Sequence, residues 1–207
     1  MKKIVLLLLV GLSLTGCTAV RINTKDIDNT INVILSKNNT LYNRVGKGYK
    51  YYVPRGVSYI DTVEFNDKLY SNGNYYYLYV DAISYFYQKE MNYEINDSAY
   101  YSREFNINDK KGYLKIEEQN GKYLINFYYN YARIQALVEK DDVESVVLNA
   151  TYILSTIKFN PEVIKLMLDD EFFTNKEEKY DIFESETEDN NFLDYADENE
   201  EEKQYRW

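Results

Sequence analysis

Apolar residues recur at helical spacing in three segments of the chain. Residues 26–37 and 143–157 carry them at i, i+3 or i+4 and i+7, which predicts two amphipathic helices near the two ends of one domain. Thr24 or Asp26 can cap the first helix, and two aspartates precede the second. Asn160-Pro161 reads as the start of a third, short helix at 162–168.

Between the two long helices the pattern changes to alternation of apolar and polar residues, which is typical of strands. Asn72-Gly73 and Asn120-Gly121 predict tight hairpin turns, because both sequences tolerate the positive φ that such turns require. The sequence therefore predicts an α+β fold, with an antiparallel sheet of five to seven strands flanked by an N-terminal and a C-terminal helix. The predicted strands are residues 49–53, 57–60, 62–70, 75–87, 100–107, 112–118 and 122–138.

The two faces of the predicted strand 75–87 differ in character, with aliphatic residues on one and tyrosines on the other. If the tyrosines are exposed, their flat rings and hydroxyls suit a carbohydrate. If a helix covers them, they belong to the core, and Asp81 pairs with Arg133 on the companion strand. The second interpretation is the simpler one. The candidate binding residues are Tyr77, Tyr79, Asp81, Tyr85 and Arg133.

The first 17 residues have the layout of an export signal. Two lysines precede an apolar run over residues 4–14, which is shorter than the roughly 20 residues of a membrane-spanning helix. Residues 14–17, Leu-Thr-Gly-Cys, resemble the lipobox of bacterial lipoproteins. The resemblance implies removal of residues 1–16, diacylation of Cys17 and anchoring on the outer side of the cytoplasmic membrane. An ordinary cleaved signal or a transmembrane anchor is the alternative.

Charge divides the chain at about residue 169. The net charge is −10, yet residues 169–207 hold 16 Asp/Glu and four Lys/Arg, so the preceding residues sum to +2. We expect a lipidated tether at 17–24, a single α+β domain at 25–168 and a disordered acidic tail at 169–207. Phenylalanines scattered in the tail leave docking to a partner as an alternative. A nearly neutral domain without a basic patch argues against nucleic acid as a partner.

The residue types restrict the chemistry. Histidine is absent, which excludes His-based general acid–base catalysis, and Cys17 is the only cysteine. The sequence predicts neither a metal site nor a cofactor, and we expect a protein that is not an enzyme. The alternative is a cell-wall hydrolase that uses paired carboxylates. Its candidates on predicted strands are Glu64, Asp81, Glu104, Glu117 and Glu118.

Three short segments resemble the PsbP/Mog1-like group over residues 45–160. They are residues 49–56 near the start, 121–125 in a late strand and 153–159 at the end of a helix. The resemblance implies an antiparallel sheet flanked by helices and a role as a binding or assembly factor, often exported or membrane-associated. It carries over no functional residue. For an anchored protein of this kind, an envelope protein or a cell-wall glycan lies within reach.

Overall fold

The computed structural model describes residues 27–63 and 66–169. The lipobox with Cys17, the acidic tail beyond residue 169 and the candidate carboxylate Glu64 lie outside the described residues, so the predictions about them stay predictions.

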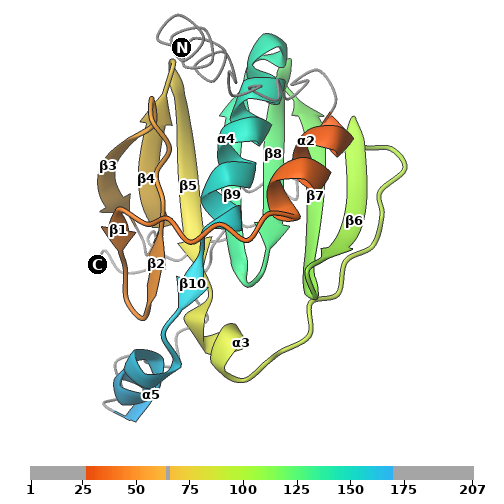
Figure 1. The fold of residues 1–207 in the computed structure, drawn as a ribbon. Coiled ribbons are helices and arrows are strands. Elements are labelled where there is room, and N and C mark those ends of the chain that lie inside the picture. The colour runs from red at the N-terminus through yellow and green to blue at the C-terminus, as the bar shows by residue number, and fades with distance from the viewer. Residues whose placement is uncertain (1–26, 64–65, 170–207) are drawn as a thin grey trace, which may run out of the picture.

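Seven strands form one antiparallel sheet in the order β3-β4-β5-β9-β8-β7-β6 (Figure 1). Two meanders, β3 to β5 and β6 to β9, join side by side where β5 pairs with β9. Within each meander, strands that follow one another in the chain pair antiparallel. The strands are β3 (Ser58–Val63), β4 (Asn66–Ser71), β5 (Asn74–Val80), β6 (Tyr101–Ile107), β7 (Lys110–Gln119), β8 (Lys122–Tyr129) and β9 (Ala132–Val138).

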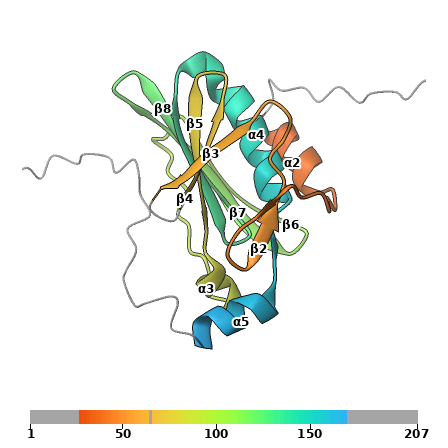
Figure 2. The same ribbon diagram turned by 90° about the vertical axis from the view of Figure 1, so that its left-hand side faces the viewer.

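Two helices, α2 (Ile27–Leu35) and α4 (Val143–Ser155), cover one face of this sheet (Figures 1 and 2). A 3-10 turn, η1 (Lys140–Asp142), leads into α4. The apolar stripes of the helices and the inward residues of the strands make one continuous buried core, as the two periodicities predict. Its fully buried members include Ile31, Tyr76, Leu78, Leu114, Ile116, Ile125, Phe127, Ile134, Val146, Ala150 and Ile153.

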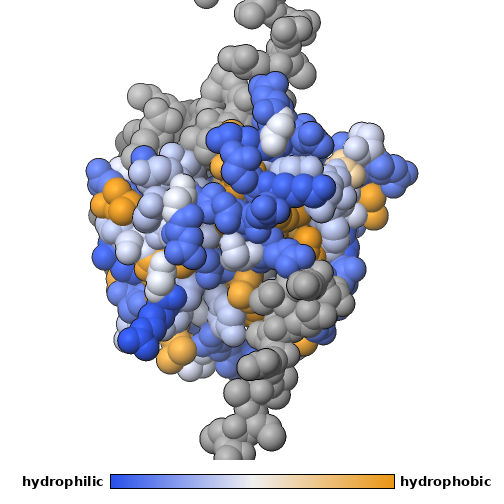
Figure 3. Space-filling view, turned by 90° about the horizontal axis from the view of Figure 1, so that it is seen from above, coloured by the Kyte–Doolittle hydropathy of each residue, from blue (hydrophilic) through white to orange (hydrophobic). Residues whose placement is uncertain are grey.

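A second, three-stranded sheet has the order β1-β2-β10 and consists of β1 (Arg44–Val45), β2 (Tyr49–Tyr51) and β10 (Lys158–Phe159). Two short helices, α3 (Ala82–Phe86) and α5 (Pro161–Asp169), lie together below the main sheet (Figure 2). Asn160 caps α5, since its side-chain oxygen accepts a 3.3 Å hydrogen bond from the Val163 N–H. Seen from above, the opposite end is mainly hydrophilic, and its hydrophobic residues lie in separate spots (Figure 3).

The predicted α+β class and its antiparallel sheet flanked by helices are confirmed. Two predicted strands are wrong because each covers parts of two strands that pair with each other. Residues 62–70 belong to β3 and β4, which pair with each other. Residues 122–138 are β8 and β9, joined at Asn130 and Tyr131, whose φ values are +52° and +60°. That turn contains neither glycine nor proline, so Asn130 is the one residue in it whose type favours a turn. None of the described helices is long and apolar enough to cross a membrane.

The predicted strand 75–87 is also wrong beyond Val80, where the chain turns into α3. Asp81 causes the change, because its Oδ1 accepts a 2.7 Å hydrogen bond from the Ser84 N–H and so caps the helix. Tyr85 consequently lies on a helix, and its ring stacks on Phe159 of β10 at a centroid distance of 3.8 Å. Both residues thus help to hold α3 in place.

Candidate functional site

Three of the five candidate binding residues, Tyr77, Tyr79 and Arg133, come together on the sheet face that points away from α2 and α4. Their neighbours Tyr76, Leu78 and Ile134 are buried against the helices, and alternation along a strand places the intervening side chains on the opposite face. Tyr79 lies directly opposite Arg133 in the pairing of β5 with β9.

The strand register extends this set into two transverse rows across β5, β9, β8 and β7. We call the eight side chains the tyrosine face. One row is Tyr77, Gln135, Asn126 and Lys115, and the other is Tyr79, Arg133, Tyr128 and Tyr113. Each row crosses three strand spacings, or about 14 Å. Both rows combine aromatic rings with amide or cationic donors.

Stacked tyrosines continue one row toward the edge of the sheet. The Tyr113 ring is parallel to that of Tyr128 at a centroid distance of 5.6 Å, and Tyr93 stacks on Tyr113 at 4.1 Å. The hydroxyls of Tyr93 and Ser102 are 2.7 Å apart, which fixes the segment between α3 and β6 over this end of the face. Burial, followed by the nearby carboxylate of Asp81, raises the pKa of the Tyr128 hydroxyl. Tyr128 therefore stays a neutral hydrogen-bonding group.

The middle of the tyrosine face is polar and yet sheltered. Gln135 is only 3 % exposed, and Asn126 Oδ1 is buried without a hydrogen-bond partner. A buried amide oxygen lacking a donor is uncommon and costs free energy, so Asn126 is a position where a ligand hydroxyl or amide would be stabilised.

Tyr77 and Tyr79 are half-buried. The sequence predicted either exposed tyrosines that bind a ligand or fully buried tyrosines of the core, and the observed burial lies between the two. Their side chains are less exposed to solvent than residues on an open surface and more exposed than the core residues on the helix side. Among the described elements, the long helices lie on the other side of the sheet (Figure 2).

Three of the carboxylates suggested for hydrolysis lie on the two strands at one edge of the sheet, Glu104 on β6 and Glu117 and Glu118 on β7. Glu104 faces Tyr113 across β6 and β7, whereas Glu117 lies four residues further along β7, or about 13 Å away. Glycosidases place their two carboxyl groups roughly 5–9.5 Å apart. Glu117 is also paired with Lys115 at 2.9 Å, and Glu118 accepts a long 3.5 Å bond from the Tyr123 hydroxyl. Within the described residues, no group of three or more His, Cys, Asp or Glu side chains could hold a metal ion.

Five members of the tyrosine face were missed as candidates in the sequence, namely Asn126, Gln135, Lys115, Tyr113 and Tyr128. The cause is the undetected turn at Asn130: a single strand over 122–138 assigns Arg133 to the face of Tyr123 and Ile125, which is in fact the core face. Recognising that Asn tolerates positive φ would have been the signal.

Comparisons of the chain with protein-family models, with curated proteins and with solved structures found no match. The candidate site therefore rests on its own geometry.

Proposed function

We propose that this chain is a membrane-anchored surface lipoprotein that acts as a non-catalytic binding or assembly factor at the outer face of the cytoplasmic membrane. The observation that carries the binding role is the tyrosine face, where four tyrosines alternate with Arg133 and two side-chain amides across four strands. The lipobox ending at Cys17 supports the location. Two acyl chains supply the double hydrophobic signal needed for stable anchoring, at about 0.8 kcal/mol per buried CH₂.

A cell-envelope glycan is the ligand class that this face fits best. Tyrosine rings offer flat apolar surfaces that also carry a hydroxyl, while the half-buried side chains of Asn126 and Arg133 supply donors for sugar hydroxyls. The unpaired Asn126 Oδ1 would gain a donor from such a ligand. An envelope protein is the other partner class, and the PsbP/Mog1-like resemblance favours it. That resemblance stays a prediction, as does the alternative of a carboxylate-dependent hydrolase.

The test compares Tyr79→Ala with wild type in two measurements, retention on insoluble peptidoglycan and urea unfolding. If the face binds glycan, Tyr79→Ala should weaken retention at least tenfold and lower the free energy of unfolding by no more than about 1–2 kcal/mol. Tyr42→Ala is the matched control, because Tyr42 is exposed on a loop and lies outside both rows. Arg133→Gln gives a second variant that removes the cation without opening a large cavity.

A different outcome would overturn the proposal. If Tyr79 is part of a packed layer, Tyr79→Ala should cost about 3–5 kcal/mol, as large-to-small changes in cores do. Wild-type protein that shows no retention on peptidoglycan, or Arg133→Gln protein that is retained as well as wild type, would argue against glycan binding at this face.

A further inference from the structure

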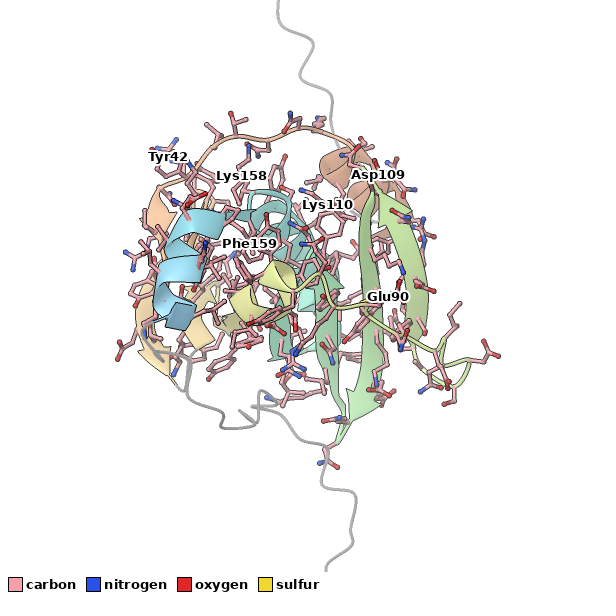
Figure 4. The ribbon with its side chains drawn as sticks, turned by 90° about the horizontal axis from the view of Figure 1, so that it is seen from below. Tyr42, Glu90, Asp109, Lys110, Lys158 and Phe159 are labelled. Carbon is pink, nitrogen blue, oxygen red and sulfur yellow. The ribbon has the colours of Figure 1, made fainter. Side chains whose placement is uncertain are left out.

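Three lysines meet in a pocket at the lower end of the molecule, on the helix side of the sheet. The pocket has a volume of about 320 Å³ and lies where the C-terminal ends of α2 and α4, the β6–β7 turn and β10 converge. Lys37, Lys110 and Lys158 line it together with Asn38, Asn39 and Asn108, and none of its lining residues is acidic. Figure 4, seen from below, labels Lys110 of β7 and Lys158 of β10 at this end. We call this cavity the lysine pocket.

Lys110 and Lys158, the two half-buried lysines of the pocket, have no ion-pair partner among the described residues. Lys110 is half-buried, its Nζ lies 5.9 Å from the centre of the Tyr129 ring, and Lys158 is close enough to repel it. Burial and then repulsion by Lys158 lower the pKa of Lys110. Two ammonium groups held together without a carboxylate destabilise the empty pocket and favour an anion within it.

Helix C-termini offer a structural explanation for nearby lysines, since their free carbonyls attract cations. At α2, however, other donors already satisfy these carbonyls. Asn108 Nδ2 donates to the carbonyl of Leu35 at 2.8 Å, and the Lys37 backbone N–H donates to that of Ile34 at 3.2 Å. The Ser36 hydroxyl donates to the carbonyl of Val33.

The end of α4 is satisfied in the same way. The Thr156 hydroxyl donates to the Ile153 carbonyl at 2.7 Å, and the Ile157 N–H donates to that of Leu154. The Ser155 hydroxyl donates to the carbonyl of Tyr152 at 2.7 Å. The side-chain amines of Lys110 and Lys158 are therefore not needed to complete the hydrogen bonding of either helix.

We propose that the lysine pocket binds a phosphate group through Lys110 and Lys158. A lysine ammonium recognises phosphate as a point charge with three donors, and two of them match the charge of a phosphate near neutral pH. The asparagine amides at the rim add neutral donors to phosphate oxygens. The volume leaves room for a substituent on the phosphate. This site is separate from the tyrosine face, so its test can fail without bearing on glycan binding.

Thermal unfolding of the full-length chain in inorganic phosphate, with sodium chloride at matched ionic strength as reference, tests the site. Phosphate at ten times its dissociation constant should raise the Tm of wild type by about 3–5 °C more than chloride does. Lys110→Gln and Lys158→Gln should abolish this difference. Lys140→Gln is the control, because Lys140 is exposed and lies at the opposite end of α4, about 20 Å away.

The Tm of the lysine variants in phosphate-free buffer distinguishes a phosphate site from lysines that only stabilise the helix C-termini. Since each substitution removes a repulsion, Lys110→Gln and Lys158→Gln should unfold at the wild-type Tm or above it in phosphate-free buffer. A lower Tm for both, together with an undiminished phosphate effect, would show that the lysines serve the fold. A wild-type protein that responds equally to phosphate and chloride would also overturn the proposal.

Two further arms identify the source of the phosphate. Short-chain phosphatidic acid and short-chain phosphatidylcholine, both below their micelle concentrations, replace inorganic phosphate in the same measurement. If phosphatidic acid raises the Tm and Lys110→Gln abolishes the rise, the site accepts a lipid headgroup. If only inorganic phosphate acts, the site takes a soluble phosphate, and both results support the proposal.

Discussion

The hydroxyl of Tyr51 donates a 2.6 Å hydrogen bond to Oδ2 of Asp67, and both side chains are buried. Tyr51 belongs to the small sheet and Asp67 to β4 of the main sheet, so this contact fastens one sheet to the other. The Thr62 hydroxyl donates to the other carboxylate oxygen at 2.8 Å. Burial, and then the hydrogen bond to Asp67, raise the pKa of Tyr51, which keeps its hydroxyl a donor.

Tyr51→Phe should therefore destabilise the protein out of proportion to the single atom removed. The buried carboxylate of Asp67 loses one of its donors, and an under-satisfied charged group costs about 1–3 kcal/mol. Urea unfolding measures the loss. Tyr49→Phe is the control: Tyr49 stacks beside Tyr51 but its hydroxyl makes no hydrogen bond within the described chain. Equal stability of the two variants would contradict this role for Tyr51.

The sequence was informative where a periodic pattern ran without interruption. The apolar spacing of α2 and α4 and the hairpin at Asn120-Gly121 gave those elements nearly their observed bounds. Prediction failed where one side chain redirects the chain, as Asp81 does by capping α3, and where Asn130 and Tyr131 turn without glycine. Each event is marked in the local sequence by a single residue type, Asp81 as a helix cap and Asn130 as a turn residue, which is a weak signal.

The sequence predicted part of the tyrosine face and nothing of the lysine pocket. The tyrosines of β5 were visible through their alternation, but the register that places Arg133 beside Tyr79 depends on pairing between distant strands. The lysine pocket joins residues from positions 37, 110 and 158, which only the folded chain brings together. Long-range pairing of this kind has no local signal.

Asp28 should make the stability depend on acid pH. It accepts hydrogen bonds from Tyr101 and Arg103 of β6, so it holds α2 against the sheet edge. These partners, first Tyr101 and then Arg103, lower the pKa of Asp28 below its ordinary value of 3.8, although burial opposes them. A lowered pKa in the folded state adds stability above about pH 4, and this contribution is lost as the pH falls through the folded-state value.

The measurement is urea unfolding of wild type and Asp28→Asn at pH 6 and at about pH 3. The carboxylate is 57 % exposed, so the difference at pH 6 should stay below about 1 kcal/mol. It should shrink at the lower pH, as wild-type Asp28 also becomes neutral. Asp97→Asn is the control, because Asp97 is exposed on a loop. A difference that does not change with pH would mean that charge contributes nothing to this contact.

Cys17→Ala should release the protein from the membrane. The lipobox predicts that this cysteine carries the diacylglycerol, and its loss removes both acyl chains. Incorporation of radiolabelled palmitate and the membrane-bound fraction should both fall to background, while Thr18→Ala should leave them unchanged. Membrane retention of Cys17→Ala at the wild-type level would favour an uncleaved helical anchor.

Gly112→Ala should destabilise the main sheet at β7, the strand next to the edge. Gly112 lies in β7 opposite Phe105 on one side and Tyr129 on the other. A Cβ atom there would come within 2.7 Å of the Tyr128 carbonyl oxygen and closer still to the ring of Phe105. The ring can shift, but the carbonyl belongs to the paired backbone of β8 and moves only if the ladder distorts. Overpacking of this kind costs about 1–3 kcal/mol, which urea unfolding would detect.

The double variant Phe105→Leu with Gly112→Ala separates the two contacts. Leucine lacks the ring atoms that approach Gly112, so its presence should lessen the effect of Gly112→Ala when compared with Phe105→Leu alone. Part of the loss should persist, because the Tyr128 carbonyl is unchanged. If Gly112→Ala lowers the free energy of unfolding in wild type but not in Phe105→Leu, the whole loss comes from the ring. A Gly112→Ala protein within about 0.5 kcal/mol of wild type would show that β7 has room for a side chain at this position.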